Sequence, residues 1–383
     1  MASQQEEENP SSATTTTTTP SESGSNDDDD DDDNNKDDRC YSVTANRFAN
    51  NYATVTETAT TNTTTESFQV DVEVEVQVRV PTLAFGLYKV PKGDEGVRII
   101  SDAILRAGYR HLDSASIYGN EKTLGRALAA MLGCGGGCKS SSSNRNQIQQ
   151  LDRSELFVAS KVWNDAQKGG RAAVRKSVEQ SLEDLGPGLE YLDICYVHWP
   201  VPGYFVEAYR ELLQMQQEGK IKFLGISNFR ICDYQELMAK IPSDEFLPPL
   251  IHQFEISPFM YRPKTIHYFL QEQNMLVAAS KALNRMSSLD DDGSDSDSDH
   301  AAVVKDIAKS HFVTPAQVML RWSVQKGLVV LSKTTSLSRM MENRALFGVG
   351  FSLSPHEMDR LDGITTKDVV VAREALEATR RTS

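Results

Sequence analysis

The sequence of 383 residues is poor in cysteine, and the few cysteines it has do not form a recognisable framework. The five lie at positions 40, 134, 138, 195 and 232, an odd and scattered set that suits a reducing compartment. Cys134 and Cys138 stand in the Gly- and Ser-rich stretch "CGGGCKSSSS", but no second ligand pair at matching spacing accompanies them. A flexible insertion is therefore favoured over a zinc site, and no metal is expected.

Long apolar runs are also missing, because none approaches the 18 residues that a membrane span requires. The start, "MASQQEEENP", lacks the basic and apolar regions of a secretory signal, so a cytoplasmic protein is expected. Of the formal net charge of −14, about −12 belongs to residues 1–66, and a further six Asp lie between Asp290 and Asp299. The remainder therefore carries roughly +4, a small charge for its length, which predicts neither a nucleic-acid nor a membrane partner.

The chain divides by composition into a tail and one long domain. Residues 1–66 are rich in Thr and Asp and hold too few apolar side chains to offset the entropy of ordering, so a disordered acidic tail is expected. Residues 67–383 form the main domain. Two polar, low-complexity insertions, near 133–152 and 286–300, are expected to lie outside its packed core.

The main domain begins with a strictly alternating segment, "FQVDVEVEVQVRV", which predicts a strand of an N-terminal β-hairpin. Eight short apolar runs then alternate with segments of helical periodicity, as in "RAAVRKSVEQSLEDLG" and "TPAQVMLRWSVQKG". This order predicts an α/β fold, a (β/α)8 TIM barrel whose bottom the hairpin closes. A doubly wound sheet would need a G-x-G-x-x-G turn, which is absent. The predicted strands are 82–88, 111–115, 156–163, 191–199, 221–229, 249–257, 275–283 and 327–334.

Polar and aromatic side chains stand at the ends of most of these strands, where barrels of this type carry their active sites. Any one of them has an ordinary structural explanation, such as a helix cap or a satisfied core histidine. Their occurrence together predicts a single functional site at the carboxyl end of the barrel. The residues are Tyr88, Asp113, Tyr118, Lys161, Trp163, His198, Trp199, Ser227, Asn228, Gln253 and Lys333.

Several of these strand ends lie in motifs that resemble the aldo-keto reductase family. The segments "GYRHLDSASIYGNE", "ASKVW", "YVHWP", "GISNF", "HQFEISPF" and "LSKTTSLSRMMEN" follow the family's order, and the resemblance covers about residues 75–363. It implies an NADP(H)-dependent reduction of an aldehyde or ketone to an alcohol, with Asp113, Tyr118, Lys161 and His198 as catalytic residues. Such a reaction needs a proton donor for the developing alkoxide, and a neighbouring ammonium lowers the pKa of a tyrosine toward that task.

The resemblance also implies where the cofactor and the substrate bind. Ser227, Asn228 and Gln253 match the positions that hold the nicotinamide carboxamide. Aromatic side chains are expected to line the substrate wall, with His198 orienting the carbonyl oxygen. The positions near the adenosine 2′-phosphate and adenine are Lys333, Thr334, Arg339, Glu342 and Asn343, and the substrate-binding positions are Tyr88, Trp163, His198 and Trp199.

The sequence departs from the family pattern at Ala279, where relatives carry a tyrosine that stacks on the nicotinamide. The segment after about residue 363 also lacks the usual pattern and has a partly helical character. The alternative reading is an NADPH-binding regulatory or scaffold subunit of the same fold with little turnover. In either case a monomer and a small-molecule carbonyl ligand are expected.

Overall fold

The computed structural model describes residues 43–49, 52–65, 68–132, 150–284, 297–348 and 350–382. Most of both predicted insertions, together with Cys134 and Cys138, falls outside these residues. The second insertion was expected to extend to residue 300, but the helix that follows it already begins at Asp297. Among the described residues, no helix is both long and apolar enough to cross a membrane.

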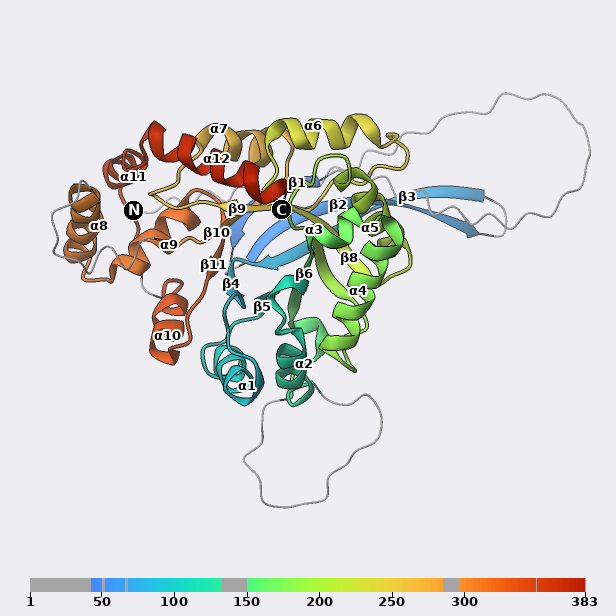
Figure 1. The fold of residues 1–383 in the computed structure, drawn as a ribbon, viewed down its shortest axis with the longest axis horizontal. Helices are drawn as coiled ribbons and strands as arrows, with labels where there is room; N and C mark the ends of the chain where they lie inside the picture. The colour runs from blue at the N-terminus through green and yellow to red at the C-terminus, as the bar shows by residue number, and fades with distance from the viewer. Residues whose placement is uncertain are drawn as a thin grey trace, which may run out of the picture. The chain divides into compact units, whose positions relative to one another are not determined.

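Eight parallel strands close into a barrel in the order β10-β11-β4-β5-β6-β7-β8-β9 (Figure 1). All eight strands predicted from the apolar runs are confirmed, and each is buried along most of its length, as expected of strands covered on both faces. The strands are β4 (Leu83–Gly86), β5 (His111–Asp113), β6 (Phe157–Val162), β7 (Leu192–Val197), β8 (Ile221–Ser227), β9 (Ile251–Glu255), β10 (Leu276–Ser280) and β11 (Val329–Ser332).

Helices follow the strands and cover the outside of the barrel. Thr314 caps the helix that begins at Pro315, because its side chain accepts a hydrogen bond from the backbone N–H of Gln317. The helices are α1 (Gly93–Ser101), α2 (Glu121–Ala129), α3 (Asn164–Lys168), α4 (Arg171–Leu185), α5 (Phe205–Gln217), α6 (Ile231–Lys240), α7 (Pro263–His267), α8 (Asp297–Ser310), α9 (Pro315–Gln325), α10 (Leu337–Ala345), α11 (Pro355–Asp362) and α12 (Lys367–Thr382), with π-helical turns η1 (Asp102–Arg106) and η4 (Tyr268–Glu272) and 3-10 turns η2 (Ser116–Tyr118) and η3 (Arg153–Glu155).

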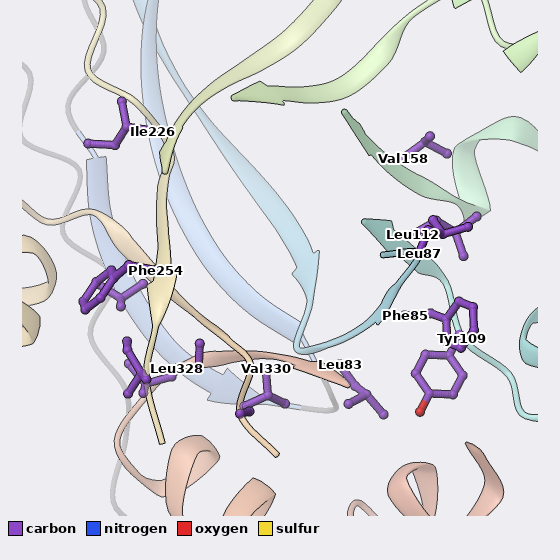
Figure 2. Packing of buried hydrophobic residues seen from close by; sticks show 14 of the residues in the cluster. Leu83, Phe85, Leu87, Tyr109, Leu112, Val158, Ile226, Phe254, Leu328 and Val330 are labelled. Carbon is purple, nitrogen blue, oxygen red and sulfur yellow. The ribbon is translucent and has the colours of Figure 1, made fainter. Parts of the chain in front are cut away.

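Two hydrophobic clusters hold the barrel and its helices together. The larger one lies between the strands and the helices, and Figure 2 shows Leu83, Phe85 and Val330 among its members. The smaller one joins inward-facing residues of several strands, such as Ala159 and Ile194. Among the described residues, the interior of the barrel is therefore a packed core, and a ligand is expected at the carboxyl end of the barrel, where barrels of this type carry their sites.

An antiparallel sheet, β1-β2-β3, precedes the barrel. It is made of β1 (Val43–Ala49), β2 (Tyr52–Thr65) and β3 (Phe68–Pro81). Ala53, Val78 and Val80 of this sheet belong to the same cluster as the inward-facing barrel residues, so the predicted hairpin at the barrel bottom is confirmed. Regular structure was expected only from residue 67, yet the structure places two strands between residues 43 and 65. For β2 the difference has a physical reason, because much of this strand is threonine, a β-branched residue that favours strands, and β2 pairs along its whole length with the alternating β3. Residues 1–42 lie outside the described residues.

Candidate functional site

The carboxyl ends of β5, β6 and β7 bring four sequence-predicted residues together. Asp113 is the last residue of β5, and the 3-10 turn that follows carries Tyr118. Gly119 ends that turn at a φ of +64°, a conformation that glycine adopts without strain. Lys161 lies near the end of β6 and His198 directly after β7.

Lys161 is the centre of this group and is only 1% exposed. Its Nζ donates to Asp113 Oδ2 at 2.7 Å and to the backbone carbonyl of Ser114 at 2.6 Å. The other carboxylate oxygen of Asp113 accepts a hydrogen bond from Gln253 Nε2 at 2.8 Å. Burial lowers the pKa of Lys161, but Asp113 and Tyr118 together outweigh burial, so the pKa lies above its usual value and the ammonium is retained.

Tyr118 lies above this ion pair, with its ring centroid 5.3 Å from Lys161 Nζ. Burial raises the pKa of Tyr118, and the opposing effect of Lys161 is smaller, so the net pKa lies above the usual value. The sequence led us to expect a net lowering by the lysine. The lysine does act in that direction, but desolvation of the phenol exceeds it. The structure therefore keeps the Tyr118 hydroxyl protonated in the free protein.

His198 faces Tyr118 from β7, with 6.0 Å between the ring centroids. Burial and the nearby charge of Lys161 hold the pKa of His198 well below its usual range, so the imidazole is neutral. Its Nδ1 is buried and has no hydrogen-bond partner among the described residues. The backbone carbonyl of His198 accepts a hydrogen bond from Asn228 Nδ2 at 3.0 Å, which links this residue to the end of β8.

Aromatic rings extend the site outward on both sides of the pair formed by Tyr118 and His198. Tyr88 contacts Tyr118 at 5.2 Å and Trp163 contacts His198 at 5.0 Å between ring centroids. Tyr88 is 57% exposed, which leaves its ring accessible. Trp199 differs from these rings, because it is only 4% exposed and its carbonyl accepts a hydrogen bond from Gln167. Three of the four expected substrate-binding residues, Tyr88, His198 and Trp163, are therefore connected in one row through Tyr118, whereas Trp199 is buried.

The three residues expected near a nicotinamide carboxamide also lie together. Asn228 follows Ser227 at the end of β8 with a φ of +60°, and its backbone N–H donates to the Gln253 carbonyl at 2.9 Å. Both Nδ2 hydrogens of Asn228 are used, one by the His198 carbonyl and one by Ser227 Oγ. Within the described part of the chain, Asn228 Oδ1 accepts no hydrogen bond. This oxygen suits the amino group of a carboxamide.

The residues expected near a 2′-phosphate lie after β11 and in α10. Lys333 and Arg339 are both exposed, and neither forms an ion pair with another described residue. Two unpaired cations six residues apart fit a phosphomonoester. Thr334 is buried, and its Oγ1 accepts a hydrogen bond from the backbone N–H of Ser336.

The two residues expected near the adenine already have contacts within the protein. The carboxylate of Glu342 accepts a hydrogen bond from Thr314 Oγ1, and Asn343 is buried near the Tyr109 hydroxyl. Ala279 is fully buried within the larger hydrophobic cluster and offers no ring to a cofactor. Among the residues that the structure describes, no cluster of His, Cys, Asp or Glu could hold a metal ion.

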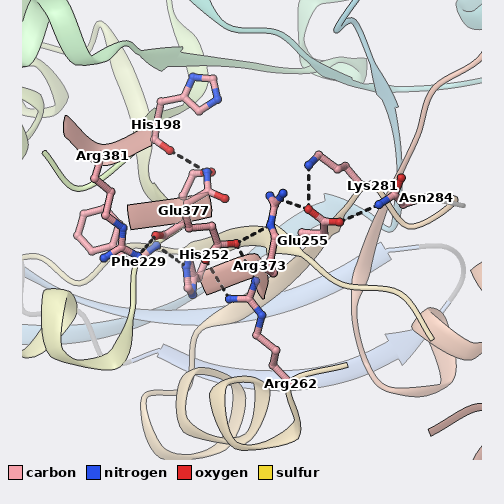
Figure 3. A network of polar contacts seen from close by, with 12 residues as sticks. His198, Phe229, His252, Glu255, Arg262, Lys281, Asn284, Arg373, Glu377 and Arg381 are labelled. Carbon is pink, nitrogen blue, oxygen red and sulfur yellow. Dashed lines mark hydrogen bonds and ion pairs between the residues drawn. The ribbon is translucent and has the colours of Figure 1, made fainter. Parts of the chain in front are cut away.

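Sequence reasoning missed a group of ionic contacts at the same end of the barrel, and Figure 3 shows those of Arg373 with Glu255 and of Arg262 with Glu377. Arg373 of α12 binds Glu255 at the end of β9 at 2.6 Å, and Glu377 of α12 binds Arg262 at 2.7 Å. Arg381, in the last turn of α12, pairs with Asp233 at 2.8 Å. No motif marks these residues, and the partly helical character of the C-terminal segment was the one signal that the sequence offered.

Comparisons with known proteins identify the family to which this chain is similar. The family model described as "Aldo/keto reductase family" matches residues 82–366. The oxidoreductase YtbE of Bacillus subtilis (strain 168), described as uncharacterized, is 33% identical over 74% of this chain and 89% of its own length. Glyoxal reductase of the same organism is 32% identical over 76% of this chain and 91% of its own length. A crystal structure of a Gox0644 mutant in complex with NADPH is 27% identical, covers 76% of this chain and 92% of its own, and has a TM-score of 0.61.

Proposed function

Because this chain belongs to the aldo/keto reductase family, whose members are oxidoreductases that act on carbonyl compounds, we propose that it reduces an aldehyde or a ketone to an alcohol with NADPH. The observation that carries the proposal is the buried ion pair of Lys161 and Asp113, whose ammonium lies 5.3 Å from the centroid of the Tyr118 ring. This arrangement provides a proton donor next to a fixed positive charge.

In this proposal NADPH, when bound, supplies the hydride that adds to the carbonyl carbon. Tyr118 donates its phenolic proton to the carbonyl oxygen, so that the hydride and the proton together give the alcohol. As the phenolate forms, Lys161 stabilises its negative charge, and Asp113 keeps Lys161 charged and in place. His198, which is neutral, orients the carbonyl oxygen by a hydrogen bond. The alcohol leaves with the transferred proton, and the Tyr118 phenolate is then reprotonated by solvent.

The cofactor would lie along the ends of β8, β9 and β11. Ser227, Asn228 and Gln253 would hold the carboxamide, while Lys333 and Arg339 would hold the 2′-phosphate. Asn228 Oδ1, Lys333 and Arg339, which have no hydrogen-bond acceptor role or ion-pair partner among the described residues, support this placement. Thr334, Glu342 and Asn343 would complete the adenosine end of the site.

Tyr88, Trp163 and Trp199 would border the substrate, with Trp199 as a support beneath the surface. The similarity to glyoxal reductase favours a small aldehyde, and a screen should therefore begin with glyoxal and methylglyoxal before simple aldehydes, ketones and aldoses.

The test is to measure NADPH consumption across that screen, with Tyr118→Phe as the matched variant. The variant lacks only the phenolic oxygen, so it should bind NADPH as the parent does while kcat falls by about a hundredfold or more. A variant with nearly the parent's kcat would refute the role of Tyr118. Binding of NADPH with no turnover of any carbonyl would instead support a regulatory subunit.

A further inference from the structure

The C-terminal helix α12 contacts the carboxyl ends of β6 and β8, the two strands on either side of His198 in the barrel order. Asn164, just after β6, donates through Nδ2 to the backbone carbonyl of Arg380 at 2.8 Å. Arg381 Nη2 donates to the backbone carbonyl of Asn228 at 3.1 Å. The last turn of α12 therefore touches the residue that the proposed function assigns to the nicotinamide carboxamide.

Asn228 adopts a conformation that needs support from its surroundings. Its φ of +60° lies in the left-handed region, which residues other than glycine visit infrequently. Its N–H is held by Gln253 and its Nδ2 by His198 and Ser227. The backbone carbonyl is held only by Arg381 among the described residues. This one contact therefore completes the set that fixes the direction of the free Oδ1.

Arg381 is itself firmly placed, which makes it a rigid donor. Its side chain is 6% exposed and its Nη1 donates to Asp233 Oδ2 at 2.8 Å. Asp233 lies in the first turn of α6 and also binds Arg230 at 2.7 Å. The carboxylate thus fixes the guanidinium, whose fork geometry directs a second nitrogen at the Asn228 carbonyl.

We infer that Arg381 is a positioning residue for the cofactor site, through which helix α12 sets the affinity of the protein for the nicotinamide end of the cofactor. The inference rests on the proposed function, because it takes Asn228 as a carboxamide ligand. Loss of Arg381 would free the Asn228 carbonyl, allow the left-handed backbone to relax, and turn Oδ1 away from the cofactor.

The experiment compares Arg381→Gln with Arg380→Gln, the same change at the exposed neighbouring residue, whose backbone contact to Asn164 does not depend on its side chain. The dissociation constant of NADPH is measured by quenching of tryptophan fluorescence, at a temperature where both variants are folded. We expect about tenfold weaker binding for Arg381→Gln, the equivalent of one charge-assisted hydrogen bond, and an unchanged constant for Arg380→Gln.

Two further ligands separate positioning from general loosening of the fold. NADH shares the nicotinamide end, so its affinity should fall by the same factor. The fragment 2′-phospho-ADP-ribose lacks the nicotinamide, so Arg381→Gln should bind it as tightly as the parent. Equal losses for the fragment and for NADPH would overturn the inference, as would equal NADPH constants for Arg381→Gln and Arg380→Gln.

Arg381→Lys is the variant to use if Arg381→Gln does not fold. It keeps a positive charge facing Asp233, but its single nitrogen cannot contact both Asp233 and the Asn228 carbonyl in the way that the guanidinium does. It should bind NADPH several-fold more weakly than the parent, and a constant equal to that of the parent would overturn the inference. If the parent protein itself does not bind NADPH, the proposed function fails and this inference fails with it. The inference alone fails if the parent binds NADPH and the Arg381 variants either bind NADPH as the parent does or lose affinity for NADPH and the fragment equally.

Discussion

Replacement of Asp113 by asparagine is the sharpest test of the buried ion pair. Lys161 Nζ is held at 2.7 Å by the carboxylate and at 2.6 Å by one carbonyl, and both side chains are almost completely buried. Asp113→Asn removes the negative charge and leaves a buried ammonium with a single neutral acceptor. Breaking a buried pair in this way costs about 3–5 kcal/mol, which for a barrel of about 300 residues lowers Tm by about 5–8 °C.

The same variant should reverse the dependence of stability on pH. In the parent, burial lowers the pKa of Lys161 but Asp113 and Tyr118 raise it further, so the folded pKa lies above the usual value of 10.5. The stability that this shift contributes is present below that pH and is lost as pH rises through the folded pKa. Without Asp113 burial dominates, and the folded pKa falls below that of the unfolded chain. The unfolded state then binds more protons, so the variant should gain stability as pH rises toward 10.5.

The assay is urea unfolding, followed by far-UV circular dichroism, across neutral to alkaline pH. Asp94→Asn is the matched control, because Asp94 pairs with Arg126 at 2.6 Å where both side chains are exposed. An exposed pair contributes less than about 1 kcal/mol, so this control should keep the stability and pH profile of the parent. If Asp113→Asn loses no more stability than the control, or if its stability falls with rising pH as the parent's does, the ion pair is not the stabilising unit described here.

Three further predictions concern the cofactor, the N-terminal sheet and His198. Arg339→Ala should weaken NADPH binding about tenfold and leave NADH binding unchanged, since only NADPH carries the 2′-phosphate; equal losses, measured by fluorescence quenching, would contradict this role. Removal of residues 1–40 should leave Tm nearly unchanged, whereas removal of residues 1–66 takes away β2 and the buried Ala53 and should lower it by several degrees in thermal melts. Because burial and Lys161 keep the pKa of His198 far below its usual value, the rate of NADPH consumption should show no step near pH 6.5; a step that disappears in His198→Asn would show that the histidine is charged.

The barrel and the location of its site could be read from local patterns. A short apolar run predicted each strand, because a strand that is covered on both faces is apolar along most of its length. The sequence alone was enough to group Asp113, Tyr118, Lys161 and His198, since the carboxyl ends of parallel strands meet at one end of a barrel. The alternation in residues 68–80 likewise predicted β3, but nothing in it indicated how far its partner extends into the Thr-rich segment.

What only the tertiary structure decided was how charge and burial balance between residues distant in the chain. The sequence suggested that Lys161 would lower the pKa of Tyr118, but the degree of desolvation depends on everything packed around the phenol, and it reverses the net direction. Trp199 was expected to line the substrate site, but its side chain is buried because neighbouring parts of the chain cover it. Arg381 and Asn228 are 153 residues apart, and their contact exists only because α12 returns to the carboxyl ends of the strands. Local sequence patterns indicate which face of a single helix or strand is apolar. The pKa of Tyr118, the burial of Trp199 and the contact of Arg381 depend instead on which helices and strands pack against one another.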